Sequence, residues 1–445
     1  MAFAYGYFNN IPRGDMERDT SMVLACLTYE NMVLREEMWR NKETVTVLGQ
    51  KFKLPVEREK FLHFVRSKIW CTYRKGFSPI GGTGPTSDTG WGCMLRCGQM
   101  MLAQALSVLS LTEDWQWSPS LDKQPAPYRR ILTQLSDIRT SCYSIHQIAQ
   151  MGVPEGKEVG QWFGPNTIAQ VLRKLSQFDQ EHVLAFHVAM DNTVSIEDIE
   201  KVCSQPIKSP ASGQSACSSR TNSTSELRQS SSCSTTPHVV HSEKINTFWK
   251  PLFLIIPLRL GLSDINPVYF KHLKEILQWE ESVGVIGGKP NHAYYFVGCS
   301  CNDSLVYLDP HTTQLYIKFP DVDSKDLFDD ATYHCDCPGR MLVSQLDPSL
   351  ALGFVCSTRQ QFESFCNRIK TFKKSPTSLP LFEVVNAFPK CNLKESQVVT
   401  LKSHNRQKKK QVKSEGKFQE DDVCIALDSD ESLNSDEDFE ILDFD

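Results

Sequence analysis

A serine-rich segment in the middle of the chain most constrains its fold. Residues 204–244 are dominated by Ser, Thr, Gln and Pro, and 12 of the 32 residues from Ser204 to Thr235 are serine. A segment with so few apolar side chains cannot bury a core, so we predict a disordered insertion. Strand-like apolar segments, residues 182–190 and 252–260, lie on either side of it. Because long surface insertions cost little closure entropy, we expect it to loop out of one domain rather than separate two.

Length and charge divide the chain into three predicted parts. With 445 residues, the chain is long enough for a large domain with an ample core. We expect an N-terminal arm over residues 1–45, a folded domain over 46–390 and a disordered tail over 391–445. In the tail, five basic residues between 406 and 413 precede residues 418–445, which carry 12 acids and no Lys or Arg. Such charge blocks are usually solvated, although the basic run also suits anionic lipid or a nuclear import receptor.

Composition predicts a cytoplasmic protein without a membrane span. The longest apolar candidate, residues 252–262, is interrupted by Pro257 and Arg259, and no run reaches 18 apolar residues. The first residues lack a basic region followed by an apolar stretch, so no secretory signal is expected. In the cytosol the 16 cysteines should be reduced thiols. The net charge of −5 does not favour nucleic acid as a partner.

Apolar spacing predicts several elements around the candidate site. Residues 57–70 have the spacing of a helix with one buried face. Asn166 is predicted to cap a second helix, whose buried face includes Ile168 and Phe178. A loop rich in Gly and Pro, residues 77–85, leads towards Cys93. Short consecutive strands are predicted over residues 294–299, 304–308 and 314–319.

Cys93 stands where a glycine-flanked turn leads into a predicted helix. Gly90 and Gly92 permit backbone angles that other residues avoid, and they let a substrate chain approach closely. In the first helical turn, unpaired N–H groups and the positive end of the dipole lower a thiol pKa from about 8.5. The alternative is a structural cysteine in a buried helix, and the local context does not decide between the two. The helix itself is predicted from apolar residues that share one face, namely Leu95, Leu102, Ala105 and Leu106.

A candidate base and its orienting acid lie in the sequence Asp309-Pro310-His311. A thiolate nucleophile needs a base and a group that orients the base. In an extended segment, positions i and i+2 project to the same side, so Asp309 and His311 could reach one site. The acid would hold the imidazole and stabilise its charged form, leaving the other ring nitrogen for Cys93. A turn with a solvated histidine is the alternative for these three residues alone.

Four segments in this order resemble the autophagins, the cysteine proteases that process and delipidate the ubiquitin-like modifiers of autophagy. The resemblance covers most of residues 47–390 and rests on residues 73–106, 160–167, 287–291 and 308–313. It implies an α+β, papain-like fold, with Cys93 as nucleophile, His311 as base and Asp309 as its orienter. It also implies that Tyr73 forms the oxyanion hole together with the Cys93 backbone N–H.

The same resemblance implies a narrow groove for a substrate tail that ends in glycine. Trp162 and a loop containing Gly287, Gly288 and Pro290 would cover this groove; for Trp162, core packing is the alternative. Attack of Cys93 on the glycine carbonyl would release a peptide from a precursor or an aminophospholipid from a conjugate. The implied partners are GABARAP-type modifiers, with membrane contact only through the substrate. We expect a monomeric enzyme that needs no cofactor and no metal.

Two further features concern the modifier and redox chemistry. In the acidic tail, Phe439 and Leu442 follow acids, as in short motifs that bind autophagy modifiers by adding an edge strand. Phosphorylation of Ser432 or Ser435 would tune such a motif. Cys97 lies one helical turn after Cys93, so it is either a redox partner or, as we favour, an inert helix cysteine.

Other readings of the sequence lead to different classes. Cys299 and Cys301, together with Cys335, Cys337 and His334, suggest zinc, but structural sites usually separate paired cysteines by two to four residues. Reduced thiols on strands are therefore favoured. A non-enzymatic scaffold that holds modifiers through its tail would not require Cys93, Asp309 and His311 together. A general ubiquitin hydrolase is the second rival to a protease of autophagy modifiers.

Overall fold

The computed structural model describes residues 42–119, 124–181, 183–206, 247–372 and 379–389. The described residues from 42 to Ala387 belong to one compact unit. Residues 207–244 of the predicted insertion, the basic run and the acidic tail lie outside the described residues. The other three residues expected in the insertion, Ser204, Gln205 and Pro206, instead form strand β6 (Ser204–Pro206), which pairs with β7 (Thr247–Trp249). The first described strand, β1 (Glu43–Val47), begins three residues before the expected start of the folded domain.

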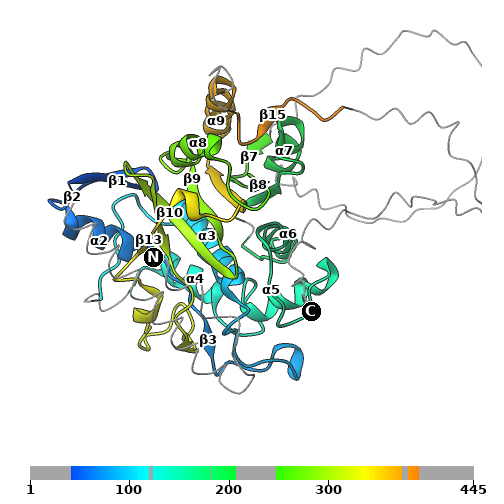
Figure 1. The fold of residues 1–445 in the computed structure, drawn as a ribbon. Helices are drawn as coiled ribbons and strands as arrows, with labels where there is room; N and C mark the ends of the chain where they lie inside the picture. Colours follow the sequence, from blue (N-terminus) through cyan, green and yellow to red (C-terminus); the bar gives the residue numbers. More distant parts are fainter. Residues whose placement is uncertain (1–41, 120–123, 182, 207–246, 373–378, 390–445) are drawn as a thin grey trace, which may run out of the picture. The chain divides into compact units, whose positions relative to one another are not determined.

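A mixed sheet forms the centre of the described unit (Figure 1). Its neighbours pair antiparallel, except that β4 runs parallel to β8. The β1–β2 hairpin, with β2 at Gln50–Leu54, extends the sheet by pairing β1 with residues 298–300. In spatial order the strands are β13 (Gly339–Leu342), β11 (Ser304–Leu308), β10 (His292–Ser300), β9 (Ser282–Lys289), β14 (Ser349–Cys356), β8 (Leu252–Arg259) and β4 (Ala185–Val188).

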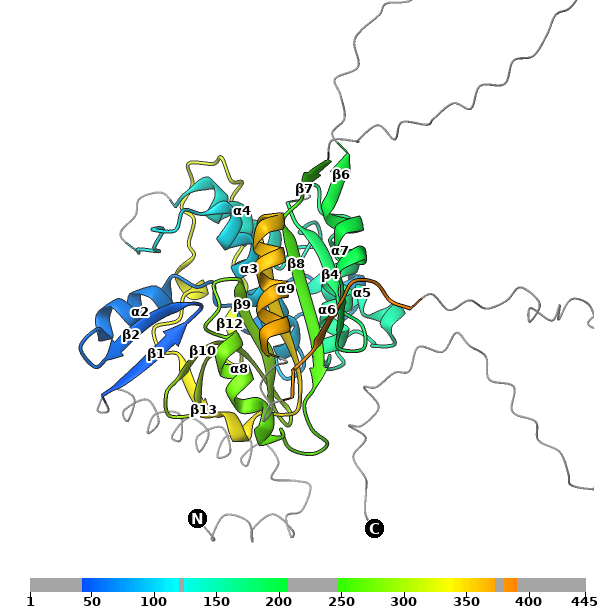
Figure 2. The same ribbon diagram turned by 90° about the horizontal axis from the view of Figure 1, so that it is seen from above.

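The long central strands of this sheet carry apolar side chains on both faces, and helices cover each face. In β8, Phe253 and Ile255 belong to one apolar cluster, whereas Leu252 and Leu254 belong to the other. Figure 2 shows α8 and α9 on the near side of the sheet, with α3 behind it. The first cluster includes α2 (Arg58–Arg66), α3 (Cys93–Ser110), α4 (Ala126–Leu135), α5 (Ile145–Met151) and α6 (Pro165–Leu175). The second includes α7 (Ile196–Cys203), α8 (Phe270–Ile276) and α9 (Arg359–Phe372).

Helix α3 is the central helix, packed between the sheet and the other helices of its face. Its residues from Cys93 to Ala103 are all buried. Gly98 allows α6 to approach, since a Cβ at this position would lie 2.4 Å from Ile168 Cγ1. The helix that begins with Cys93 is therefore held on several sides, which suits a residue whose position must be accurate.

Most of the predicted elements around the site are confirmed, with four corrections. The strands predicted at residues 294–299 and 304–308 are β10 and β11, but β12 (Gln314–Leu315) stops well before residue 319. The first predicted helix ends at Arg66, not at residue 70. The cap of α6 is Gly164 rather than Asn166, because Pro165 already occupies the first helical position. Phe178 lies beyond α6 and is 67% exposed, so its assignment to the buried face is wrong.

Several short elements connect the main ones. β3 (Arg74–Lys75) pairs in parallel with β12, and β5 (Thr193–Ser195) pairs in parallel with β15 (Glu383–Val385). The short 3-10 helices are η1 (Ile80–Gly82), η2 (Val153–Glu155), η3 (Pro267–Tyr269), η4 (Ala331–Tyr333) and η5 (Val343–Gln345). Within the described ranges, none of the helices combines the length and apolar character needed to cross a membrane.

Candidate active site

Cys93 is the first residue of α3, as its sequence context predicts. The preceding turn is closed by the Asp88 carbonyl, which accepts hydrogen bonds from the backbone N–H groups of Trp91 (3.2 Å) and Gly92 (2.9 Å). Gly90 has a φ of 89°, a conformation that favours glycine. The thiol is only 1% exposed. The nucleophile candidate therefore lies at a helix N-terminus and is covered by the protein.

Trp162 covers Cys93 directly. Its indole Nε1–H donates a hydrogen bond to Cys93 Sγ at 2.9 Å. The tryptophan comes from the segment between η2 and α6, 69 residues further along the chain. Because the indole contacts the sulfur, Trp162 lies against the candidate nucleophile as well as against the core.

His311 and Asp309 lie in the turn that follows β11. The imidazole Nδ1–H donates to Asp309 Oδ1 at 2.6 Å, and the same oxygen accepts the His311 backbone N–H at 3.0 Å. Trp70, which is distant in the sequence, holds this turn in place. Its Nε1–H donates to the Asp309 carbonyl at 2.7 Å. The Tyr73 N–H donates to the Pro310 carbonyl at 2.9 Å. With Nδ1 engaged by Asp309, Nε2 is the nitrogen left to exchange a proton with Cys93.

The electrostatics of the pair favour a thiolate and an imidazolium. Burial raises the pKa of the Cys93 thiol, but interactions with His311, the Ala293 backbone amide and the Trp162 indole outweigh burial and lower the pKa overall. Burial lowers the pKa of His311, but the hydrogen bond to Asp309 and the interactions with Cys93 raise it to about 9. Between these two pKa values, a nucleophilic thiolate faces a charged acid.

Tyr73, the residue immediately before β3, is brought to the same site. Its ring packs edge-to-face on His311, with ring centroids 5.5 Å apart. Burial, followed by the charge on Cys93, raises the pKa of the Tyr73 hydroxyl above its ordinary value. The hydroxyl therefore stays protonated and is a donor, as an oxyanion hole requires.

The glycines predicted in a groove loop lie instead in a strand. Gly287 and Gly288 belong to β9 and are buried, and only Pro290 and Asn291 form the turn to β10. A Cβ at Gly288 would lie 1.8 Å from the His292 carbonyl oxygen, so close strand packing requires this glycine. The predicted loop is therefore a tight hairpin whose turn carries the proline.

His292 is a site residue that the sequence reasoning missed. Its ring centroid lies 5.0 Å from that of His311, and its Nδ1 is 3.3 Å from the Pro290 carbonyl. Burial and the neighbouring His311 lower the pKa of His292, so near pH 7 it is neutral while His311 is charged. Only the pairing of β9, β10 and β11 brings the two histidines together.

The remaining cysteine predictions are placed as follows. Cys97 is fully buried, and burial together with the charge on Cys93 raises the pKa of its thiol well above the ordinary value. A buried, protonated thiol is typical of an inert cysteine.

Cys299 Sγ contacts the Lys274 carbonyl at 3.4 Å. Across the described ranges, no three His, Cys, Asp or Glu side chains form a group that could hold a metal ion. Phe439 and Leu442 lie outside these ranges.

A buried cysteine at a helix start, paired with a histidine that a carboxylate orients, defines the class of cysteine peptidases. Residues 58–368 match the peptidase C54 catalytic domain. The chain is 48% identical over 348 residues to cysteine protease ATG4A of Gallus gallus, covering 78% of this chain and 87% of the relative. It is 46% identical over 371 residues to cysteine protease ATG4B of Xenopus laevis, covering 83% and 90%. For cysteine protease ATG4A of Homo sapiens the identity is 47% over 357 residues, covering 80% and 85%.

The chain therefore belongs to the peptidase C54 family and is a cysteine protease. This membership confirms the resemblance to the autophagins and the α+β, papain-like fold class.

Proposed function

We propose that this cysteine protease cleaves after the C-terminal glycine of ubiquitin-like autophagy modifiers, both in their precursors and in their phosphatidylethanolamine conjugates. The observation that carries the proposal is the arrangement at Cys93. The sulfur lies under the Trp162 indole, beside a histidine held by Asp309. A flat apolar wall against the nucleophile leaves room for a residue without a side chain, so it favours glycine at the cleaved bond.

In the proposed reaction the Cys93 thiolate attacks the glycine carbonyl carbon. The developing oxyanion accepts hydrogen bonds from the Tyr73 hydroxyl and the Cys93 backbone N–H. The His311 imidazolium donates its proton to the leaving amine, and the C–N bond breaks to give a thioester. A water molecule, deprotonated by His311, then attacks the thioester, which releases the glycine carboxylate and restores the thiolate.

Access to the nucleophile requires a local rearrangement. Cys93 is 1% exposed and its sulfur is bonded to Trp162, so a substrate tail can reach the carbonyl position only if the cover moves. The Trp162 segment and the Pro290 turn are the two walls that would separate. A modifier with a flexible C-terminal tail fits this requirement better than a compact chain end.

The wider setting of the proposal comes from the sequence and the family. We propose a monomeric cytoplasmic enzyme with an N-terminal arm, a protease domain and a C-terminal tail. GABARAP-type modifiers are the proposed partners, and membrane contact occurs through the lipid conjugate. Phe439 and Leu442 in the acidic tail would bind the modifier as an added edge strand.

The decisive experiment compares the purified full-length enzyme with Cys93→Ala on modifier precursors, lipid conjugates on vesicles and a ubiquitin precursor. The wild type should cleave the autophagy modifiers and leave the ubiquitin precursor intact, whereas Cys93→Ala should bind the modifiers without cleaving them. Cleavage by Cys93→Ala would refute the nucleophile assignment. Binding without cleavage by the wild type would support the scaffold alternative, and cleavage of ubiquitin would support the general hydrolase.

A separate measurement tests the tail. In the Cys93→Ala background, replacing both Phe439 and Leu442 by Ala should weaken capture of the modifier. Unchanged capture would remove the tail motif from the proposal without affecting the assignment of the nucleophile.

A further inference from the structure

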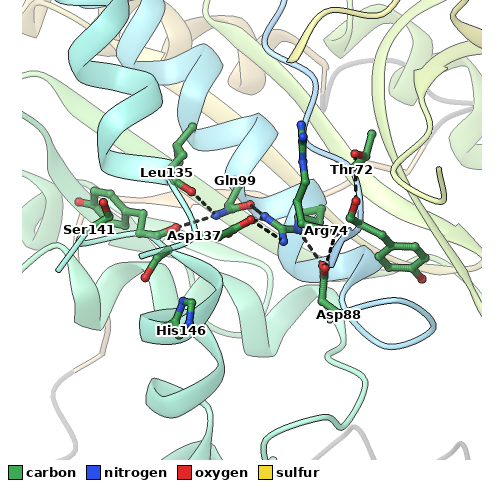
Figure 3. Close-up of polar contacts among 12 residues, drawn as sticks. Thr72, Arg74, Asp88, Gln99, Leu135, Asp137, Ser141 and His146 are labelled. Carbon is green, nitrogen blue, oxygen red and sulfur yellow. Dashed lines mark hydrogen bonds and ion pairs between the residues drawn. The ribbon is translucent and has the colours of Figure 1, made fainter. Parts of the chain in front are cut away.

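A fully buried carboxylate, that of Asp88, belongs to the turn that precedes Cys93 (Figure 3 labels Asp88). Its Oδ1 accepts a hydrogen bond from the Arg74 backbone N–H at 2.6 Å, and its Oδ2 accepts one from Arg96 Nε at 2.7 Å. Arg74 directly follows Tyr73, and Arg96 lies three residues after Cys93 in α3. One carboxylate thus connects the segment that carries Tyr73 to the helix that begins with Cys93.

Arg96 extends this connection to a third part of the fold. Its two terminal nitrogens form a bidentate pair with Asp137, at 2.9 and 3.0 Å, and its side chain is 1% exposed. Gln99 accepts a hydrogen bond from Arg96 and donates to the carbonyls of Leu135 and Tyr143. The first turns of α3 are therefore bound by charged and polar contacts to the end of α4 and to the segment that follows it, as Figure 3 shows.

The Asp88 side chain packs closely against Gly92, the residue before the nucleophile. A Cβ at Gly92 would lie 2.3 Å from Asp88 Oδ2. Gly92 has a φ of −85°, so this glycine is required by the close approach of the carboxylate and not by its backbone conformation. The residue before the nucleophile therefore rests directly on the group that holds the nucleophile helix.

We propose that Asp88 and Arg96 are positioning residues that set the spacing between the Tyr73 hydroxyl and Cys93, and so determine oxyanion stabilisation during peptide-bond cleavage. This proposal rests on the roles given above to Tyr73 and Cys93. Oxyanion donors act only within a narrow range of distance and direction, so a small shift of the Tyr73 segment against α3 costs catalysis without affecting substrate binding. The buried ions account for this rigidity, because each charge is held by partners from different segments.

Asp88→Asn tests the contact with little change in shape. The two groups that face the carboxylate, the Arg74 N–H and Arg96 Nε–H, are both donors, whereas an amide offers one acceptor and one donor. The variant must therefore lose one contact and place two donors against each other. We expect kcat to fall at least tenfold with KM within twofold of the wild type, when rates are normalised to the folded enzyme.

The matched control is Glu43→Gln. Glu43 forms a buried bidentate pair with Arg340 that joins β1 to β13, and its side chain is fully buried. This control should lower the unfolding midpoint as Asp88→Asn does, but leave kcat within twofold. If Glu43→Gln lowers kcat as much as Asp88→Asn, the effect is general destabilisation and the proposal is refuted.

A double-mutant cycle with Tyr73→Phe tests whether Asp88 affects kcat through the position of the Tyr73 hydroxyl. If Asp88 acts by positioning Tyr73, Asp88→Asn should cost less than threefold in kcat once the hydroxyl is absent. Equal losses in both backgrounds would overturn the proposal. Should Asp88→Asn not fold, Gly92→Ala displaces the same carboxylate sterically and enters the same cycle. Full activity of Cys93→Ala would instead refute the proposed function, so the two failures are distinguishable.

Discussion

The Asp309→Asn variant tests the charge pair at the centre of the site. Asp309 Oδ1 accepts hydrogen bonds from both the ring Nδ1 and the backbone N–H of His311. Replacing the carboxylate by an amide keeps the size of the side chain and removes its charge. The imidazolium loses its partner, so the pKa of His311 should fall. The thiolate then loses its cation, so the pKa of Cys93 should rise.

The structure sets the size of this effect. Burial lowers the pKa of His311, yet the hydrogen bond to Asp309 and the interactions with Cys93 raise it from 6.5 to about 9. This net rise corresponds to roughly 3 kcal/mol in favour of the imidazolium. The His311 side chain is 16% exposed, so solvent screens the interaction only in part. If Asp309 supplies about half of the rise, the equilibrium between the ion pair and the neutral pair shifts roughly tenfold towards the neutral pair.

Alkylation of Cys93 by iodoacetamide, followed as a function of pH, measures the thiolate without a substrate. The wild type should react from below the ordinary thiol range; above about pH 9, where His311 deprotonates, the thiolate persists without its imidazolium partner. In Asp309→Asn, the pH at which the rate rises should be higher by roughly one unit, which lowers the rate at pH 7 by up to about tenfold. Asp336→Asn, which changes an exposed carboxylate paired with Arg66, is the control. An Asp309→Asn profile that coincides with the wild type would refute the ion-pair reasoning.

Three other outcomes are expected. Trp162→Phe keeps an aromatic wall but removes the N–H that bonds Cys93, so the pH at which the alkylation rate rises should be higher by roughly one unit; an unchanged pH would show that this bond does not stabilise the thiolate. Gly98→Val should lower the free energy of unfolding by about 1–3 kcal/mol in urea titrations, because its side chain would overlap α6. Val108→Ala, at an exposed position of α3, should have a smaller effect. Cys97→Ala should leave inactivation by hydrogen peroxide unchanged, because that thiol is buried and protonated; slower inactivation would assign Cys97 the redox role.

Local sequence determined the parts of this protein that depend on neighbouring residues. The turn into α3 and the strands β10 and β11 follow from residue types and spacing within a few positions, so these predictions are confirmed. The errors also have local causes. Asn166 is a good cap, but Pro165 begins the helix one position earlier. Gly287 and Gly288 suggested a loop, although two adjacent glycines also suit a strand whose neighbour approaches closely.

The contacts that make the site chemically specific come from the tertiary structure. The Trp162 indole reaches Cys93 from 69 positions away, and His292 meets His311 only through strand pairing. Residue spacing carries little information about such contacts, because they depend on how the sheet and helices pack around one another.

The buried charged side chains near the start of α3 show most clearly which features follow from local sequence and which from tertiary structure. The sequence by itself determined that Cys93 begins a helix behind a glycine-flanked turn, because backbone preferences act between neighbours. Charged residues are rarely buried, so residue type alone predicts that Asp88, Arg96 and Asp137 lie on the surface. Only the tertiary structure decided that they lie together in the core, because burial of such charges is stable only when partners from distant segments meet.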